Sequence, residues 1–136
     1  MKFPFPAIAS AFRGRRAVHQ PIPDVSLADV ERIVRRDFPG TEFDAVMAVL
    51  KQYGTEKWQR ERARVQLAAL KLADRDLDKL QRFIEVASRD YRDVLVAAEY
   101  PEYGRRTSSV ANPAAIDREE VIDRDWEQYQ NWLSRP

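Results

Sequence analysis

Four acidic side chains in this sequence have the spacing of the ligands in a calcium-binding loop. Asp74, Asp76 and Asp78 occupy its first, third and fifth positions, and Glu85 occupies the twelfth, as in the oxygen-ligand pattern of an EF-hand. The sixth position is Lys79, where the sharp turn of such a loop needs glycine. We therefore interpret these acids as helix-end residues that favour the helix dipole, and we predict no metal site.

The remaining titratable side chains form no catalytic constellation. Glu119 and Asp123 are about one helical turn apart and could form a metal-ligand pair or a general acid/base couple. Arg118 and Arg124 lie among them and favour ordinary surface ion pairs. His19 is the single histidine, and the absence of cysteine excludes disulfides, thiolate nucleophiles and Cys-ligated metals. We therefore predict no catalytic residue, no metal and no cofactor.

Residues 89–93 have the sequence RDYRD and place charges of both signs in the middle of an apolar helical seam. Ion pairs at the surface are the favoured interpretation, because buried charges would need partners such as Arg62 or Arg64 on a neighbouring helix. An enzyme that uses carboxylates and tyrosines such as Asp90, Asp93 and Tyr103 is a further alternative, although no spacing argument supports it.

Three arginines near the start, Arg13, Arg15 and Arg16, are the best candidates for contacts to phosphate groups. They motivate the hypothesis of a nucleic-acid-associated protein whose binding weakens with salt. The formal charge of the chain is only +1, whereas a dedicated DNA-binding domain normally carries a strong basic excess. A cluster that keeps a tail in solution is therefore the favoured interpretation, and nucleic-acid binding is the alternative.

Large apolar side chains gather near the C-terminus, where Trp126, Tyr129, Trp132 and Leu133 lie at helical spacing. Burial of this face against the rest of the chain would contribute several kcal/mol at about 25 cal/mol per Å², so docking on its own core is the favoured interpretation. The functional alternative is that the four residues bind a protein partner or a second copy in a homodimer, because interfaces use aromatic anchors.

Helical periodicity must position these side chains, since no strand pattern competes with it. Ser26 and Asp29 have the spacing of a capping box, which predicts a helix over residues 27–37. Thr41 repeats the capping pattern and predicts a second helix that stops at Gly54.

Two further helices are predicted before the linker. One begins at Thr55, and its second half, residues 65–73, is apolar nearly all round and should be the most buried element. The next is predicted over residues 77–98, where apolar residues recur every three or four positions, and ends at Tyr100 and Pro101.

The fold predicted from these patterns is all-α: a compact helical bundle of four helices plus a C-terminal amphipathic helix reached by a linker. A Pro-rich basic N-terminal arm is expected over residues 1–25 and a helical core over 26–103. Residues 104–116 have a linker composition, and residues 117–136 form the aromatic helix that docks on the core or on a partner.

The composition is that of a globular domain with a heavily charged surface. The chain has 136 residues, of which 44% are apolar and 33% charged, so one domain is expected. Residues 1–36 carry seven cationic and three anionic side chains, and residues 117–127 carry two and six, so the two ends should attract each other. No stretch is apolar enough to span a membrane, and prolines interrupt the apolar start, so we expect a soluble, cytoplasmic protein.

Four runs within residues 26–103 resemble small helical bacterial proteins of uncharacterised function: YGTE, VQLAALKL, RDYRDVL and EYP. The resemblance implies a bacterial, cytoplasmic protein and brings no known activity, ligand or site residue. The leading functional hypothesis is therefore a non-enzymatic protein-interaction or regulatory module, with a nucleic-acid-associated protein and an enzyme with an unrecognised site as alternatives.

Overall fold

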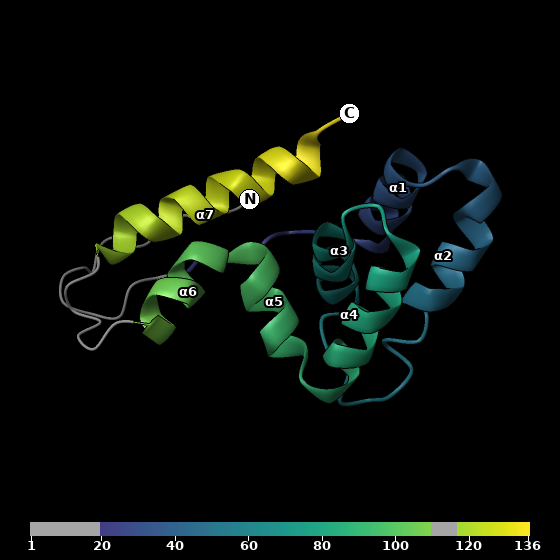
Figure 1. Ribbon diagram of the computed structural model, residues 1–136, viewed down its shortest axis with the longest axis horizontal. Helices are drawn as coiled ribbons and strands as arrows, with labels where there is room; N and C mark the ends of the chain where they lie inside the picture. Colours follow the sequence, from purple (N-terminus) through teal and green to yellow (C-terminus); the bar gives the residue numbers. More distant parts are fainter. Residues whose placement is uncertain (1–19, 110–116) are drawn as a thin grey trace.

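Every regular element is a helix in the part of the chain that the computed structural model describes, residues 20–109 and 117–136 (Figure 1). The all-α prediction is confirmed, but these ranges contain seven α-helices where the sequence predicted five. They are α1 (Leu27–Asp37), α2 (Phe43–Leu50), α3 (Arg62–Ala73), α4 (Leu77–Arg89), α5 (Tyr91–Glu99), α6 (Pro101–Ser109) and α7 (Arg118–Ser134).

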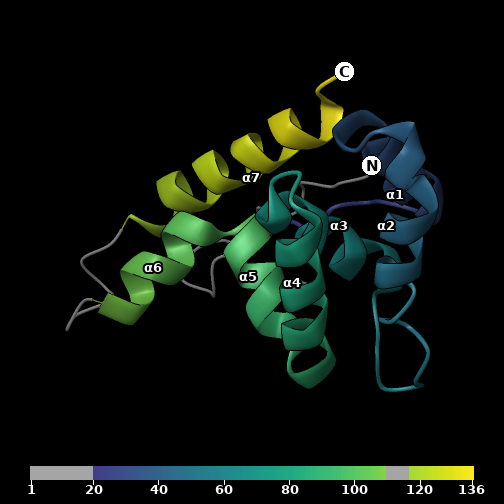
Figure 2. The same ribbon diagram turned by 45° about the vertical axis from the view of Figure 1, so that its right-hand side comes forward.

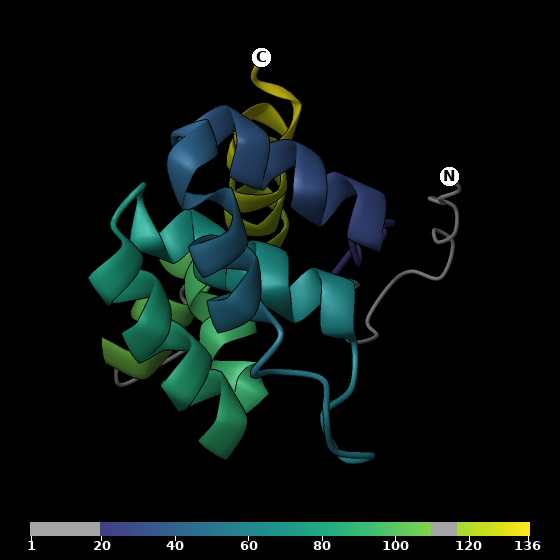
Figure 3. The ribbon, with the colours of Figure 1, turned by 90° about the vertical axis from the view of Figure 1, so that its right-hand side faces the viewer.

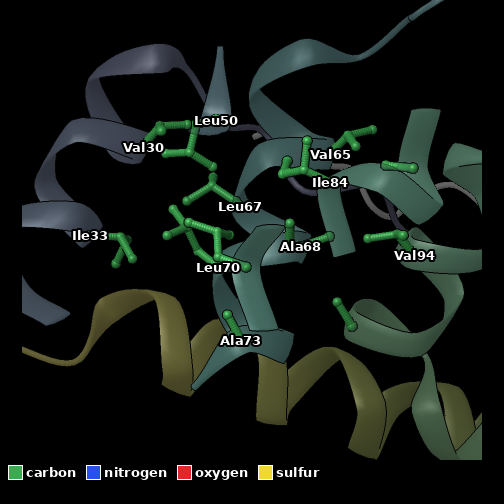
Figure 4. Packing of buried hydrophobic residues seen from close by; sticks show 14 of the residues in the cluster. Val30, Ile33, Leu50, Val65, Leu67, Ala68, Leu70, Ala73, Ile84 and Val94 are labelled. Atoms are coloured by element: carbon green, nitrogen blue, oxygen red, sulfur yellow. The ribbon is translucent and has the colours of Figure 1, made fainter. Parts of the chain in front are cut away.

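Helix α3 is the central element, as its apolar second half predicted. Its residues 65–70 and Ala73 are all buried, and the helix packs against α1, α4 and α5. In Figure 4, Leu67 and Leu70 face the residues of α1 and α2. Alanines on this helix let its neighbours approach closely, which is how one helix can contact three others.

Helix α1 begins and ends where its capping signals predicted. The Asp29 carboxylate accepts a hydrogen bond of 3.0 Å from the backbone N–H of Ser26, which satisfies one donor at the helix start. Thr41, by contrast, is not a helix cap. It lies in a short 3₁₀ turn at Gly40–Glu42, and α2 begins one residue later, at Phe43.

The prediction that Thr55 begins a helix is wrong, because residues 51–61 form a loop. The side-chain oxygen of Gln59 accepts hydrogen bonds of 2.9, 2.9 and 3.0 Å from the backbone N–H groups of Gly54, Thr55 and Glu56. One buried amide thus replaces the first turn of the expected helix. The loop lies on the side of the molecule opposite α7 (Figure 3).

The predicted helix over residues 77–98 is broken at Asp90 into α4 and α5. Asp90 has extended backbone angles, and its carboxylate accepts a 3.1 Å hydrogen bond from the backbone N–H of Arg92, so it caps α5. The apolar spacing continues across the break because α4 and α5 both pack on α3. Hydrophobic periodicity alone therefore does not show the end of α4.

The predicted linker begins too early, because residues 101–109 form helix α6. Pro101 is its first residue, a position where a missing N–H costs nothing. The next free N–H groups, of Glu102 and Tyr103, donate hydrogen bonds of 3.2 and 2.8 Å to the carboxylate of Asp125 in α7. This carboxylate is buried, so α7 supplies the cap that the α6 sequence lacks. Residues 110–116 of the predicted linker lie outside the described residues.

Helix α7 lies along α5 and α6 and reaches α1 with its C-terminal end (Figure 2). Arg36 of α1 donates hydrogen bonds of 2.7 and 2.9 Å to the carbonyl oxygens of Trp132 and Arg135, and Arg32 donates one of 3.0 Å to that of Leu133. These arginines satisfy carbonyls at the helix end, where cations are favoured. These contacts join α1 to the backbone of residues 132–135, whereas the predicted attraction involves the acidic side chains of residues 117–127.

Candidate functional site

A cavity of about 390 Å³ lies where α3, α5 and α6 meet the segment before α1. Its lining includes an ion pair, two tyrosines and several apolar side chains, a composition typical of binding sites. Among the residues that line it are Pro21, Ile22, Arg64, Val96, Glu99, Tyr100, Tyr103 and Gly104.

A buried, doubly hydrogen-bonded ion pair lines this cavity. Nε and Nη2 of Arg64, in the first turn of α3, each lie 2.7 Å from a carboxylate oxygen of Glu99, the last residue of α5. Only 15% of the Arg64 side chain and 2% of the Glu99 side chain are exposed. Glu61, which is more exposed, receives a third hydrogen bond of 2.8 Å from Arg64. The pair joins α3 to α5 with fixed geometry.

Hydrogen bonds and the attraction of opposite charges offset part of the cost of burying this ion pair. Burial raises the pKa of the Glu99 carboxyl, and the hydrogen bonds and charge of Arg64 oppose that rise. Two buried charges of this kind need each other, because either one alone would lie in a low-dielectric interior without a partner. The free energy of unfolding should therefore depend more strongly on this pair than on the other groups in this region.

Two exposed apolar side chains stand at the mouth of the cavity. Ile22 and Val96 are 60% and 46% exposed, and both belong to its lining. Gly104 of α6 lies so close to Val96 that an added Cβ would be 2.6 Å from its Cγ1. The glycine thus lets α6 approach α5 at this point.

The segment that carries Ile22 is held in place by a tyrosine. The hydroxyl of Tyr100, between α5 and α6, donates a hydrogen bond to the carbonyl oxygen of Pro21, and Pro23 is buried. Burial raises the pKa of Tyr100 well above its ordinary value, so this hydroxyl stays protonated above the pH at which an exposed tyrosine ionises. One wall of the cavity is therefore fixed by a long-range contact.

Buried tyrosines make the fold sensitive to alkali. Burial raises the pKa of Tyr53 from 10.0 to about 12, with smaller contributions from Tyr91 and Glu61, and it also raises the pKa of Tyr100 and Tyr129. Above about pH 10 the unfolded chain loses these protons while the folded chain keeps them, so stability falls as pH rises.

We expect urea denaturation to show this loss as a lower free energy of unfolding at about pH 11 than at about pH 8. Tyr53→Phe should make the dependence on pH shallower, although it also removes the 2.8 Å hydrogen bond from the Tyr53 hydroxyl to the Arg60 carbonyl. Equal slopes in wild type and variant would show that Tyr53 ionises alike in both states.

The aromatic residues predicted to bind a partner are divided between core and surface. Tyr129 is fully buried and Trp132 is 8% exposed, and their ring centroids are 5.6 Å apart. Trp126 and Leu133 are half-buried. The buried face of α7 consists of Val121, Ile122, Asp125, Tyr129 and Trp132, so two of the four predicted anchors, Tyr129 and Trp132, pack on this chain itself.

The other candidate residues either lie outside the described residues or are separated along the chain. Arg13, Arg15, Arg16 and His19 lie outside the described residues. Asp90 and Asp93 lie at the start of α5, whereas Tyr103 lies in α6, beyond the far end of α5. A helix of the length of α5 spans about 13 Å along its axis.

One of the acids at residues 74–78 caps a helix in the structure. The Asp76 carboxylate accepts a hydrogen bond of 3.1 Å from the backbone N–H of Lys79 and so caps α4. Across residues 20–109 and 117–136, no three or more acidic, histidine or cysteine side chains are grouped as metal ligands. None of the helices described there is both long and apolar enough to cross a membrane.

The comparisons with known proteins leave the geometry as the guide to function. No family model, no curated protein and no solved structure matches this chain. The resemblance to small helical bacterial proteins therefore stays an expectation.

Sequence reasoning missed Glu99 as a candidate site residue. A signal was present, because this acid follows the apolar run 94–98 and falls on the same helical face as Leu95. A charged residue on an apolar face predicts a buried partner. The identity of that partner, Arg64, is not readable from spacing, since the two residues are 35 positions apart.

Proposed function

We propose that this chain is a non-enzymatic protein-interaction module whose docking site is the cavity between α3, α5 and α6. The partner inserts an apolar side chain between Ile22 and Val96. The main support for this proposal is that two of the four large apolar side chains most exposed in the described residues stand at one cavity mouth. The resemblance to small helical bacterial proteins favours a bacterial, cytoplasmic setting.

The chemistry of the lining supports a protein partner. Tyr100, Tyr103 and Arg64 surround the apolar mouth, and tyrosine and arginine are enriched where interfaces hold their energy. The Arg64–Glu99 pair is already satisfied internally, so an apolar group can cover it without leaving a charge unpaired. The hydrogen bond from Tyr100 to Pro21 fixes one wall before binding, which lowers the entropy lost on association.

A charge at the cavity mouth should weaken partner binding. Val96→Lys replaces an exposed apolar side chain with a cation that a closed interface would have to desolvate. Trp58→Lys is the matched control, because Trp58 is 52% exposed and is not among the residues that line the cavity. Both variants should fold, since neither removes a buried group.

The measurement is quantitative affinity capture from an extract of the source cells, followed by titration of the captured protein against wild type and both variants. We expect Val96→Lys to weaken binding at least about tenfold and Trp58→Lys to leave it unchanged. Equal binding by wild type and Val96→Lys would exclude this docking site. Sedimentation velocity on the purified protein identifies the case in which the partner is a second copy.

A further inference from the structure

A second cavity of about 390 Å³ lies on another side of the molecule, between the C-terminal ends of α1, α3 and α7. It is lined mainly by charged and amide side chains, unlike the apolar cavity beside Val96. The two cavities share no lining residue, so the second cavity is distinct from the proposed docking site.

The Arg36 guanidinium, which lines this second cavity, already has partners within the protein. Nε of Arg36 lies 2.7 Å from a carboxylate oxygen of Asp37, and both side chains are almost fully buried. The same guanidinium binds two carbonyl oxygens at the end of α7 and lies 5.2 Å from the Trp132 ring centroid. Arg36 and Asp37 therefore neutralise each other.

Three other cations line the same cavity: Lys71 of α3, Arg75 in the turn after α3, and Arg135 after α7. In the ranges that the structure describes, none of their side chains has an ion pair or a hydrogen bond. Asp74 is the one further carboxylate in the lining. The unpaired groups thus carry an excess of two positive charges.

Two of these cations stand where they lower the stability of the fold. Lys71 is half-buried, and burial lowers the pKa of its ammonium group, an effect that Asp125 opposes and Arg135 increases. Arg75 has a φ of 70°, next to Asp74 with a φ of 49°, a left-handed region where glycine would cost less. Such unfavourable residues are typical of binding sites, where stability is given up for function.

We propose that this cavity binds the phosphate group of a small phosphorylated molecule through Lys71, Arg75 and Arg135. A phosphate monoester carries a charge of about −1.5 to −2 at pH 7, which matches the excess positive charge. A carboxylate would neutralise half of it. The volume exceeds what one phosphate needs, and Asn131 offers an amide group to the rest of the molecule.

The test uses inorganic phosphate and adenosine monophosphate as probes in isothermal titration calorimetry with the full chain. Lys71→Met keeps the length of the side chain and removes its charge, and Arg75→Gly removes a cation while it relieves the left-handed backbone. Each substitution should weaken binding at least about tenfold. In the absence of phosphate, each variant should melt at the same temperature as wild type or higher.

Arg82→Met is the matched control, because Arg82 is exposed on α4 and lines neither cavity. It removes the same charge and should leave phosphate binding unchanged. Three results would overturn the proposal: no binding of either probe, equal binding by wild type and the two cavity variants, or the same loss in Arg82→Met. Tighter binding of a single-stranded oligonucleotide than of both probes would also overturn it. A nucleic-acid strand binds along an extended basic surface, whereas the proposal concerns a small molecule in a cavity.

Discussion

Replacement of Arg64 with methionine will lower the free energy of unfolding by about 3–5 kcal/mol, the cost of leaving a buried charge without its partner. The Glu99 carboxylate is 2% exposed and receives two hydrogen bonds of 2.7 Å from Arg64. Methionine fills most of the volume but donates nothing, so the carboxylate must take up a proton or draw water into the core. Urea denaturation of the purified variant at neutral pH measures the loss.

Two further variants distinguish the contribution of the buried pair from that of an exposed ion pair. The double variant Arg64→Met with Glu99→Met should recover most of the stability, because an apolar pair of similar volume replaces the buried charges. Arg124→Met breaks the exposed pair with Glu120, whose side chains are 51% and 61% exposed, and should cost at most about 1 kcal/mol. If Arg64→Met were as mild as Arg124→Met, the buried pair would not hold α3 to α5.

Truncation of Tyr129 to alanine will cost about 3–5 kcal/mol, because a large side chain in the middle of the core would leave a cavity behind. Tyr129 is fully buried and belongs to the same cluster as the core residues of α1 and α3. The loss should appear in urea denaturation and as a lower melting temperature. It would show that α7 stabilises the chain on which it lies.

Removal of the hydroxyl alone gives the opposite result. Within the described residues, the Tyr129 hydroxyl is buried without a hydrogen-bond partner, a situation that costs about 1–3 kcal/mol. Tyr129→Phe should therefore be as stable as wild type or up to about 2 kcal/mol more stable. A large loss in Tyr129→Phe would mean that the hydroxyl has a partner, and a small loss in Tyr129→Ala would mean that α7 leaves the core easily.

Local signals in the sequence predicted the elements that depend on local contacts. The capping box at Ser26 sets the start of α1, and the apolar run over residues 65–73 predicts the central helix, because both depend on neighbouring residues. The acids at residues 74–78 were likewise assigned to a helix start, and Asp76 caps α4.

The errors lie where a single side chain, near or distant in the sequence, decides the structure. Residues 101–109 have the composition of a linker, but Asp125 caps them as a helix from 22 residues further along the chain. The loop before α3 depends on the side chain of Gln59, whose role no periodicity predicts. The candidate docking cavity needs α3, α5 and α6 together, so its residues share no sequence motif.

Site-specific photo-cross-linking in living cells tests the docking site most directly. A photoreactive amino acid at position 96 stands at the cavity mouth, and the same amino acid at position 58 replaces an exposed loop residue that does not line the cavity. We expect one cross-linked protein of defined mass at position 96 that is absent at position 58. No cross-link at position 96, or the same products at both positions, would contradict the claim that this cavity receives a protein partner.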